Sequence, residues 1–204
     1  MKLSLLPSAG ISSRLGSLVL LVALAGVSGC QILPDPVADP TRFYVLAGPS
    51  APTTGDATIG SLTVGLKSIS LAPYLKGRSF VVRAGEHELT YNDYARWAEP
   101  LDQGISRIIQ SRLSAAPTVG QVSVQPFPFD RSRDFDVAVS VVRCEAVREG
   151  RTLVARFAAE IEVTRGTDGS VVLRRTFTAP DQPWDGRDDG ALAGALGTAV
   201  ERLA

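Results

Sequence analysis

Residues 135–179 read FDVAVSVVRCEAVREGRTLVARFAAEIEVTRGTDGSVVLRRTFTA, and this stretch decides the fold. β-Branched and apolar residues fill three runs, which a Glu-Gly pair and a Thr-Asp-Gly triplet separate. Glycine beside an acidic residue is typical of the tight turns that join antiparallel strands. The stretch therefore predicts an antiparallel meander of three strands, at 135–147, 151–165 and 170–179.

The middle run alternates in hydrophobicity along its length. Because successive side chains of a strand point to opposite faces, we expect one set to face a core and the other to be largely solvated. The set expected inside is Leu153, Ala155, Phe157, Ala159, Ile161 and Val163, and the set expected outside is Val154, Arg156, Ala158, Glu160, Glu162 and Thr164. One face of the meander therefore covers a hydrophobic core.

Two segments show the spacing of amphipathic helices. Pro100 opens the first, because the first turn of a helix does not need the N–H that proline lacks. Asp188 and Asp189 precede the second, where acidic groups meet the positive end of the helix dipole. The apolar stripes are Leu101, Ile105, Ile108, Ile109 and Leu113 in the first helix, and Leu192, Leu196, Ala199, Val200 and Leu203 in the second.

Shorter apolar runs before the meander predict further strands, at 42–46, 59–69, 80–83, 89–92 and 121–125. Because the strands are largely consecutive in the chain, separate layers are favoured over a repeating strand–helix unit. We predict an α+β fold, a two-layer sandwich with a mainly antiparallel, mixed sheet of about seven strands and two helices on one face.

The first 29 residues have the features of a secretory signal peptide. A leader containing Lys2 and Arg14 precedes the apolar run 15–27, which as a helix spans about 20 Å, short of the roughly 30 Å hydrocarbon core of a bilayer. Small residues end the run, and Gly29 stands directly before Cys30. This pattern resembles the bacterial lipobox, in which cleavage follows Gly29 and Cys30 carries diacylglycerol and an N-acyl chain.

The alternative for this region is an ordinary signal peptide whose Cys30 forms a disulfide with Cys144. If Cys30 is acylated, Cys144 has no intramolecular partner, and we expect it to be a buried, inert thiol within the strand pattern 137–144. An intermolecular disulfide in an oxidising periplasm stays open.

Residues 30–41 are expected to tether a folded domain, 42–204, to a membrane. Their prolines disfavour a helix and suit an extended chain of about 3.1 Å per residue. Two or three acyl chains hold a protein firmly without a segment that spans the bilayer. Gln31 follows the cysteine, and the sorting rule implied by the resemblance to enterobacterial lipoproteins then favours the inner leaflet of the outer membrane, facing the periplasm.

The composition argues against several classes of function. The chain carries 21 basic and 21 acidic side chains, so it lacks the one-sided positive charge that nucleic-acid binding requires. One His and two Cys are too few for a closed zinc site. No Gly-x-Ser-x-Gly elbow or phosphate-binding loop occurs, and His87 lies in a charged hairpin tip. We therefore expect no enzymatic activity, no cofactor and no metal.

For each of two further groups of residues, the sequence allows a structural and a functional interpretation. Asp181, Asp185, Asp188 and Asp189 superficially resemble a calcium loop, but the twelfth position is Leu192 instead of the required Glu, which favours a helix-capping loop. Phe127 and Phe129 either pack onto the helix layer or form an exposed docking strip.

The segment Tyr91-Asn92-Asp93-Tyr94-Ala95-Arg96-Trp97-Ala98-Glu99-Pro100-Leu101 resembles a motif of the ABC-type transport auxiliary lipoproteins, the PqiC-like family. The other marks of the family appear in the same order along the chain, and the resemblance covers about 40–204. These marks are Phe43-Tyr44-Val45-Leu46, Leu71-Ala72-Pro73-Tyr74-Leu75, Phe80-Val81-Val82-Arg83 and the terminal helix around 199–203.

The resemblance implies a non-enzymatic, membrane-anchored periplasmic lipoprotein that serves an MCE-type intermembrane lipid transport system. Its implied role is to dock the periplasmic MCE-domain protein at the outer membrane. Further implied partners are an inner-membrane ABC permease with its ATPase, or a PqiA-like protein, and assembly into a homo-oligomer stays open. The alternatives are a periplasmic lipid carrier with an apolar cavity and a structural envelope lipoprotein. The motif positions implied in packing or in an interface are Tyr91, Tyr94, Arg96, Trp97, Glu99, Pro100, Pro73, Tyr74 and Leu75.

Overall fold

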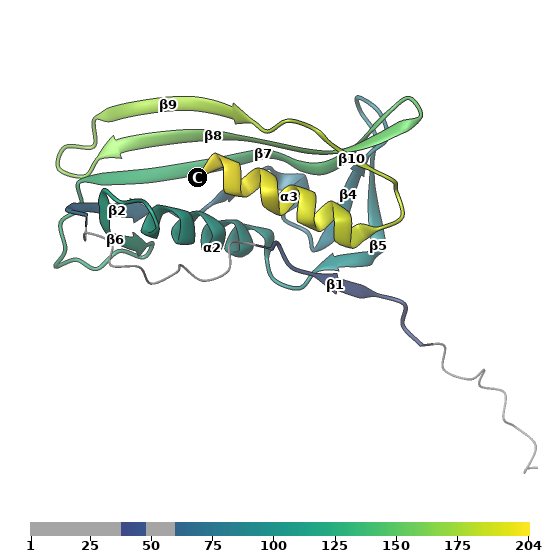
Figure 1. Ribbon diagram of the computed structural model, residues 1–204, viewed down its shortest axis with the longest axis horizontal. Coiled ribbons are helices and arrows are strands. Elements are labelled where there is room, and N and C mark those ends of the chain that lie inside the picture. Colours follow the sequence, from purple (N-terminus) through teal and green to yellow (C-terminus); the bar gives the residue numbers. More distant parts are fainter. Residues whose placement is uncertain (1–37, 48–59) are drawn as a thin grey trace, which may run out of the picture. The chain divides into compact units, whose positions relative to one another are not determined.

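A computed structural model describes residues 38–47 and 60–204, and residues 40–204 form one compact unit. The expectations for the signal peptide, for Cys30 and for most of the tether fall outside the described residues. Figure 1 shows how the strands and helices of the compact unit are arranged.

The meander is present as β7 (Phe135–Glu149), β8 (Thr152–Arg165) and β9 (Val171–Thr178). β7 pairs with β8 along its whole length, from Phe135 opposite Arg165 to Glu149 opposite Thr152. Gly150, in the turn between them, has a φ of 61°, a left-handed conformation that glycine adopts without steric cost. The antiparallel meander predicted from the alternation is therefore confirmed.

The other edge of β7 is shared by three strands, β2 (Leu62–Leu66), β3 (Ser70–Leu71) and β4 (Ser79–Arg83). All three run parallel to β7 and pair with successive parts of it, at 135–137, 140–141 and 146–147. β7 is thus the central strand. It is long enough for three strands from the first half of the domain to pair with it one after another.

Short strands widen the sheet on both sides of this centre. β6 (Val119–Val124) pairs with β2, β5 (Leu89–Trp97) pairs with β4, β1 (Arg42–Tyr44) pairs with β5, and β10 (Gln182–Trp184) pairs with β8. The α+β class is confirmed, but the sheet formed by the described residues has ten strands and not about seven. β3 and β10 were not predicted because strands of two or three residues are too short to show alternation.

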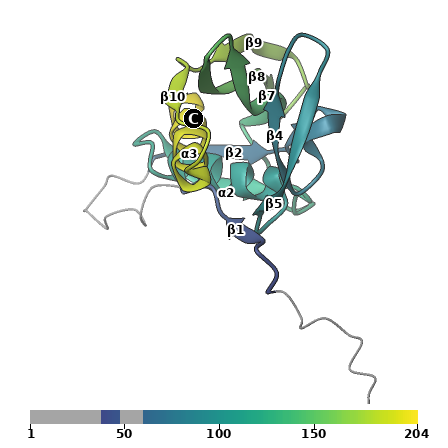
Figure 2. The ribbon, with the colours of Figure 1, turned by 90° about the vertical axis from the view of Figure 1, so that its right-hand side faces the viewer.

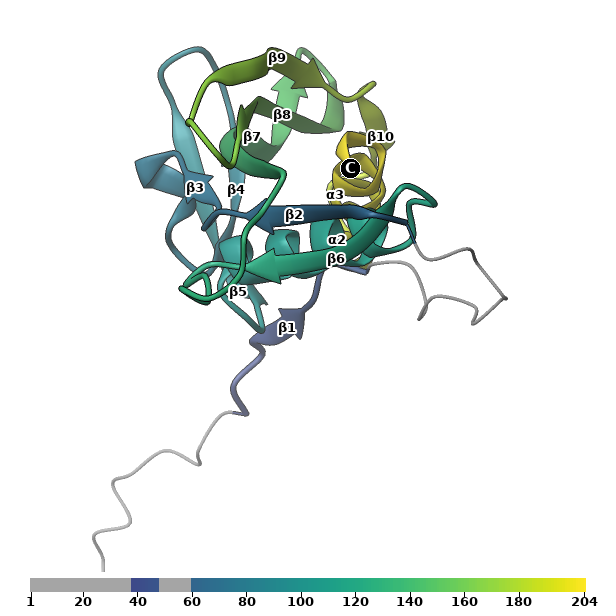
Figure 3. The same cartoon turned by 90° about the vertical axis from the view of Figure 1, so that its left-hand side faces the viewer.

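Two helices, α2 (Leu101–Ser114) and α3 (Asp189–Leu203), pack on one face of this sheet, as predicted. Figures 2 and 3 show the sheet curving around both helices. Pro100 is the N-cap residue of α2, and a carboxylate oxygen of Asp188 caps α3 by accepting a hydrogen bond from the amide of Ala191 at 3.0 Å. Within the described residues, neither helix combines the length and the apolar character that crossing a bilayer demands.

The core fills the space between the helices and the sheet. Its largest fully buried side chains include Leu66, Phe80, Ile105, Ile108, Val139, Phe157, Leu192 and Leu196. Of the predicted inward set of β8, Ala155, Phe157 and Ala159 are buried, whereas Leu153, Ile161 and Val163 are only half-buried. Of the predicted outward set, Ala158 and Thr164 are buried. The pairing of β8 with β9 shifts register between Val163 and Thr164, and such a bulge redirects side chains.

Helix α3 reaches its position because small residues let it approach the chain after β1 closely. A methyl group added at Gly197 would lie 2.6 Å from the carbonyl oxygen of Ala47, whereas nothing lies within 4 Å of one added at Gly194. Packing therefore requires a glycine at position 197 but not at position 194.

We predict that Gly197→Ala lowers the free energy of unfolding by about 1–3 kcal/mol, because the added methyl overpacks this contact. Gly194→Ala is the matched control and is expected to raise stability by about 0.5–1 kcal/mol, since alanine favours the helix. Urea unfolding of the purified protein measures both. Equal effects of the two substitutions would contradict the close approach of α3.

Candidate functional site

Most of the motif 91–101 forms the second half of β5 and leads directly into α2. A bulge interrupts β5, since Ser79 of β4 pairs with Arg96 while Phe80 pairs with Asn92. The side-chain oxygen of Asn92 accepts a hydrogen bond from the amide of Tyr94 at 3.1 Å and holds the bulge. The bulge resets the alternation, so that the residues after it divide between the two faces of the sheet.

The inward residues of the motif belong to the core. Trp97 is only 4% exposed, and the centroid of its ring lies 4.2 Å from that of Phe80. Tyr44 of β1 adds a third ring, with its centroid 5.3 Å from that of Phe80. This aromatic cluster fixes β1, β4 and β5 to one another, so Trp97 is a packing residue.

Glu99 and Pro100 hold the junction between β5 and α2. A carboxylate oxygen of Glu99 lies 2.6 Å from the Arg107 guanidinium, which also donates to the carbonyl oxygen of Leu46 at 3.1 Å. The Pro100 carbonyl accepts the amide of Gln103 at 3.0 Å. These two motif positions therefore tie the strand, the helix and the segment after β1 together.

The outward residues of the motif reach solvent. Tyr94 is 60% exposed, and Arg96 lies next to it on the same outward face. β1 continues this face, because Phe43 pairs with Arg96 and is 61% exposed, and Val45 is 55% exposed. We call these four residues, Phe43, Val45, Tyr94 and Arg96, the β1–β5 face. Tyr94 and Arg96 are the residues that the motif contributes to this face, and both are available to another molecule.

The segment 73–75 forms a single 3-10 turn, η2 (Pro73–Leu75), which covers the outer face of β4 and β7. Leu75 is buried beneath it, and the hydroxyl of Tyr74 donates to the carbonyl oxygen of Val142 at 3.0 Å. Tyr91, before the bulge, donates to the carbonyl oxygen of Tyr74 at 3.5 Å. The second family segment therefore packs directly on the first.

Under this turn lies a buried ion pair that the sequence did not single out. The Glu145 side chain is 0% exposed, and its two carboxylate oxygens accept the Nε of Arg83 at 2.7 Å and Nη2 at 3.4 Å. The Arg83 guanidinium carbon lies 5.6 Å from the centroid of the Tyr74 ring. The available signal was an acidic residue in an otherwise apolar run, together with the arginine that ends Phe80-Val81-Val82-Arg83.

The electrostatics of this cluster keep it in one protonation state near neutral pH. Burial, and then the carboxylate of Glu145, raise the pKa of Tyr74 to about 12. The hydrogen bond to Glu145 raises the pKa of Arg83. The cluster therefore holds a protonated phenol and a closed ion pair, which suits a structural role.

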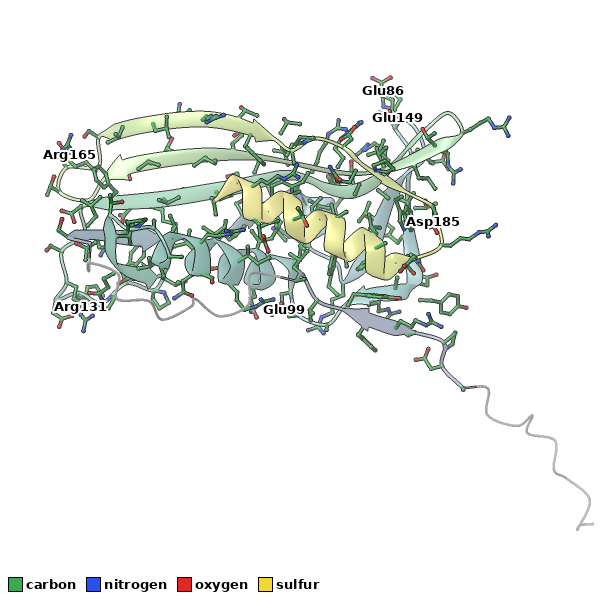
Figure 4. The ribbon with its side chains drawn as sticks, viewed as in Figure 1. Glu86, Glu99, Arg131, Glu149, Arg165 and Asp185 are labelled. Atoms are coloured by element: carbon green, nitrogen blue, oxygen red, sulfur yellow. The ribbon has the colours of Figure 1, made fainter. Side chains whose placement is uncertain are left out.

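The remaining reactive groups are likewise occupied or solvated. Cys144 is buried, and burial raises the pKa of its thiol to about 12, as expected for an inert core cysteine. His87 stands in the β4–β5 hairpin beside Glu86, both about nine-tenths exposed, and Figure 4 shows Glu86 at the tip. Among the described residues no group of three or more His, Cys, Asp or Glu side chains has the arrangement of a metal site.

The aspartates after β9 serve the loop and the helix. Asp181 pairs with Arg156, with 3.0 Å between Oδ1 and Nε. Asp185 accepts the amides of Arg187 and Asp188 at 2.8 and 2.9 Å. Together with the capping role of Asp188, this confirms a helix-capping loop.

The two phenylalanines after β6 do not join the core. Phe127 is half-buried under the Arg133 guanidinium, whose carbon lies 4.0 Å from the ring centroid, and Phe129 is fully exposed. The interpretation that both pack onto the helix layer is therefore wrong. The prolines on either side hold this segment outside the sheet.

Two of the hollows lined by described residues are open and of mixed polarity. One of about 470 Å³ lies beside Ser68, Ile69, Lys76 and Asp102, and one of about 260 Å³ lies beside Tyr91, Asn92, Arg148 and Trp184. Neither of these two hollows is enclosed enough to bury most of a two-chain lipid, as a ligand pocket does.

Comparison with known proteins adds a family and a fold. A family model described as ABC-type transport auxiliary lipoprotein component matches residues 44–204. A search of curated protein sequences gave no significant match. The crystal structure of protein XCC0632 from Xanthomonas campestris superposes with a TM-score of 0.67 at 21% identity, covering 79% of this chain and 90% of that one.

A second crystal structure, described as an uncharacterized protein, superposes with a TM-score of 0.59 at 19% identity and covers 80% of this chain and 96% of that one. At these identities the two structures support the fold alone. The family match spans the aromatic cluster, η2 and the buried ion pair described above.

We predict that Glu145→Leu lowers the free energy of unfolding by about 3 kcal/mol, because it leaves Arg83 without its buried partner. Glu201→Leu, which breaks the exposed pair with Arg112, is the control and should cost at most about 1 kcal/mol. The double substitution Arg83→Met, Glu145→Leu is expected to restore much of the loss. Urea unfolding checks all three, and a loss at Glu145 no larger than at Glu201 would argue against the buried pair.

We also predict that alkaline conditions destabilise the protein partly through Tyr74. The folded state holds this proton up to a pKa of about 12, whereas the unfolded chain releases it near 10, so its contribution is present below pH 10 and is lost between about pH 10 and 12. In Tyr74→Phe the fall in stability over this range should be smaller than in the wild type. Cys144 contributes equally to both proteins, and identical pH profiles would refute the assignment.

Proposed function

Because this chain belongs to the family of ABC-type transport auxiliary lipoprotein components, we propose that it is a non-enzymatic subunit of an MCE-type intermembrane lipid transport system. In this role it is anchored to the outer membrane by acyl chains on Cys30 and docks the periplasmic MCE-domain protein there. The observation that carries the proposal is the match over 44–204, which includes every segment that builds the cluster around Tyr74, Arg83 and Glu145.

The chemistry of the described residues supports a binding subunit over an enzyme. The thiol of Cys144 is buried and protonated, the carboxylate of Glu145 is paired with Arg83, and the phenol of Tyr74 donates to a backbone carbonyl. A catalytic site needs a nucleophile or an acid–base group that can reach its substrate. Here Tyr74 and Arg83, whose pKa values are raised, hold the sheet and η2 together.

The anchor supplies the affinity that such a subunit requires. Each acyl methylene transferred into a bilayer contributes about 0.8 kcal/mol, so two or three chains retain the protein at the membrane. A domain on a short tether then meets its partner at a high effective concentration, and a modest interface is enough for docking. Gln31 next to the lipidated cysteine supports the outer membrane as the location.

The proposed function and its alternatives predict that different molecules accompany the protein during purification. Gentle extraction followed by lipid mass spectrometry should give a lipid-free domain that co-purifies with the MCE-domain protein and the ABC permease or PqiA-like protein. Stoichiometric bound phospholipid would favour the lipid carrier. Co-sedimentation with peptidoglycan would favour the structural envelope lipoprotein.

We predict that Cys30→Ser abolishes labelling of the protein by radioactive palmitate and moves the protein out of the membrane fraction. Cys144→Ser is the matched control and should change neither property, since the buried thiol is not an acylation site. Labelling followed by membrane fractionation measures both. An unlabelled wild-type protein, or fractionation unchanged by Cys30→Ser, would refute the anchor.

A further inference from the structure

The β1–β5 face is an exposed apolar surface at the point where the tether enters the fold. Phe43 of β1, Val45 directly after β1 and Tyr94 of β5 are each more than half exposed. Tyr44, Ala95 and Trp97, which alternate with the residues of this face along the chain, pack in or against the core. The side chains of the face are therefore not part of the core.

Two arginines lie at one end of this face. Arg96 belongs to it, and Ser79, which pairs with Arg96, follows Arg78 in the turn before β4. The carbonyl oxygen of Arg78 accepts the amide of Trp97 at 2.7 Å, so this arginine lies against the end of β5. The bulge also contains the exposed Asp93, whose backbone carbonyl oxygen accepts the Nε of Arg96 at 3.1 Å.

The length of the tether limits how far this face lies from the acyl chains. Eleven residues, 31–41, separate Cys30 from β1. Fully extended, they reach at most about 40 Å, and an unrestrained chain of this length keeps its ends closer than that. The exposed strand β9 at the opposite side of the sheet, visible at the top of Figure 1, has no such connection.

We propose that the β1–β5 face rests on the lipid surface to which the protein is anchored, with its aromatic side chains at the level of the phospholipid headgroups. This proposal rests on the lipid anchor of the proposed function. Tyrosine and other aromatic side chains suit this interface, and arginines beside them attract anionic headgroup phosphates. The second contact restricts rotation about the tether and holds the domain in one orientation.

The test compares two valines of similar exposure in the acylated protein. Val45 is 55% exposed on the β1–β5 face and Val172 is 50% exposed on β9. Val45→Cys and Val172→Cys are each labelled with an environment-sensitive fluorophore, while buried Cys144 and acylated Cys30 do not react. The proteins are reconstituted into vesicles of phosphatidylethanolamine and phosphatidylglycerol that contain brominated lipid.

We expect the label at position 45 to be quenched several-fold more strongly by the brominated lipid than the label at 172. Substituting both Phe43→Ser and Tyr94→Ser should remove this difference while the protein still floats with the vesicles. Equal, weak quenching at both positions of a floating protein would overturn the membrane contact and leave the anchor intact. Protection of position 45 only after addition of the MCE-domain protein would overturn it in favour of a protein partner. A wild-type protein that does not float at all refutes the anchor itself.

Discussion

The length of β7 is the constraint on which the rest of the fold depends. One edge of this strand is paired throughout with β8, and the other is divided among β2, β3 and β4 in turn. β2 and β4 pair with β6 and β5 on their far edges, but β7 supplies the partners of their near edges, and an unpaired buried N–H or C=O is costly. The curved sheet that holds α2 and α3 follows from this shared edge (Figures 2 and 3).

The same arrangement explains why the domain contains a buried ion pair between Arg83 and Glu145. β3 and β4 pair with successive parts of the same edge of β7, and the connection between them contains η2, whose Tyr74 lies beside the Arg83–Glu145 pair. A carboxylate in that position needs a cation and hydrogen bonds, which Arg83 supplies. Tyr74, whose pKa is raised by burial and by Glu145, thus serves to hold η2 on the sheet.

The proposed role depends on the position and the surfaces of the domain. The aromatic cluster of Tyr44, Phe80 and Trp97 fixes the first strand of the domain, directly after the residues proposed as the tether. The β1–β5 face belongs to the same strands, so the proposed anchor and the proposed membrane contact lie next to each other in the chain. In that arrangement, surfaces elsewhere on the domain are left for the proposed partner protein in the periplasm.

Local sequence determined the meander, both helices with their caps, the buried Cys144 and the family, because periodicity, turn glycines and motifs are properties of neighbouring residues. Tertiary structure alone decided the parallel pairing of β2, β3 and β4 with β7, since partners distant in the chain leave no local signal. The tertiary structure also decided which residues of the motif 91–101 lie in the core and which face solvent. The bulge at Asp93 sends Trp97 into the core and Tyr94 to solvent, and burial of Glu145 depends on a turn that comes 70 residues earlier.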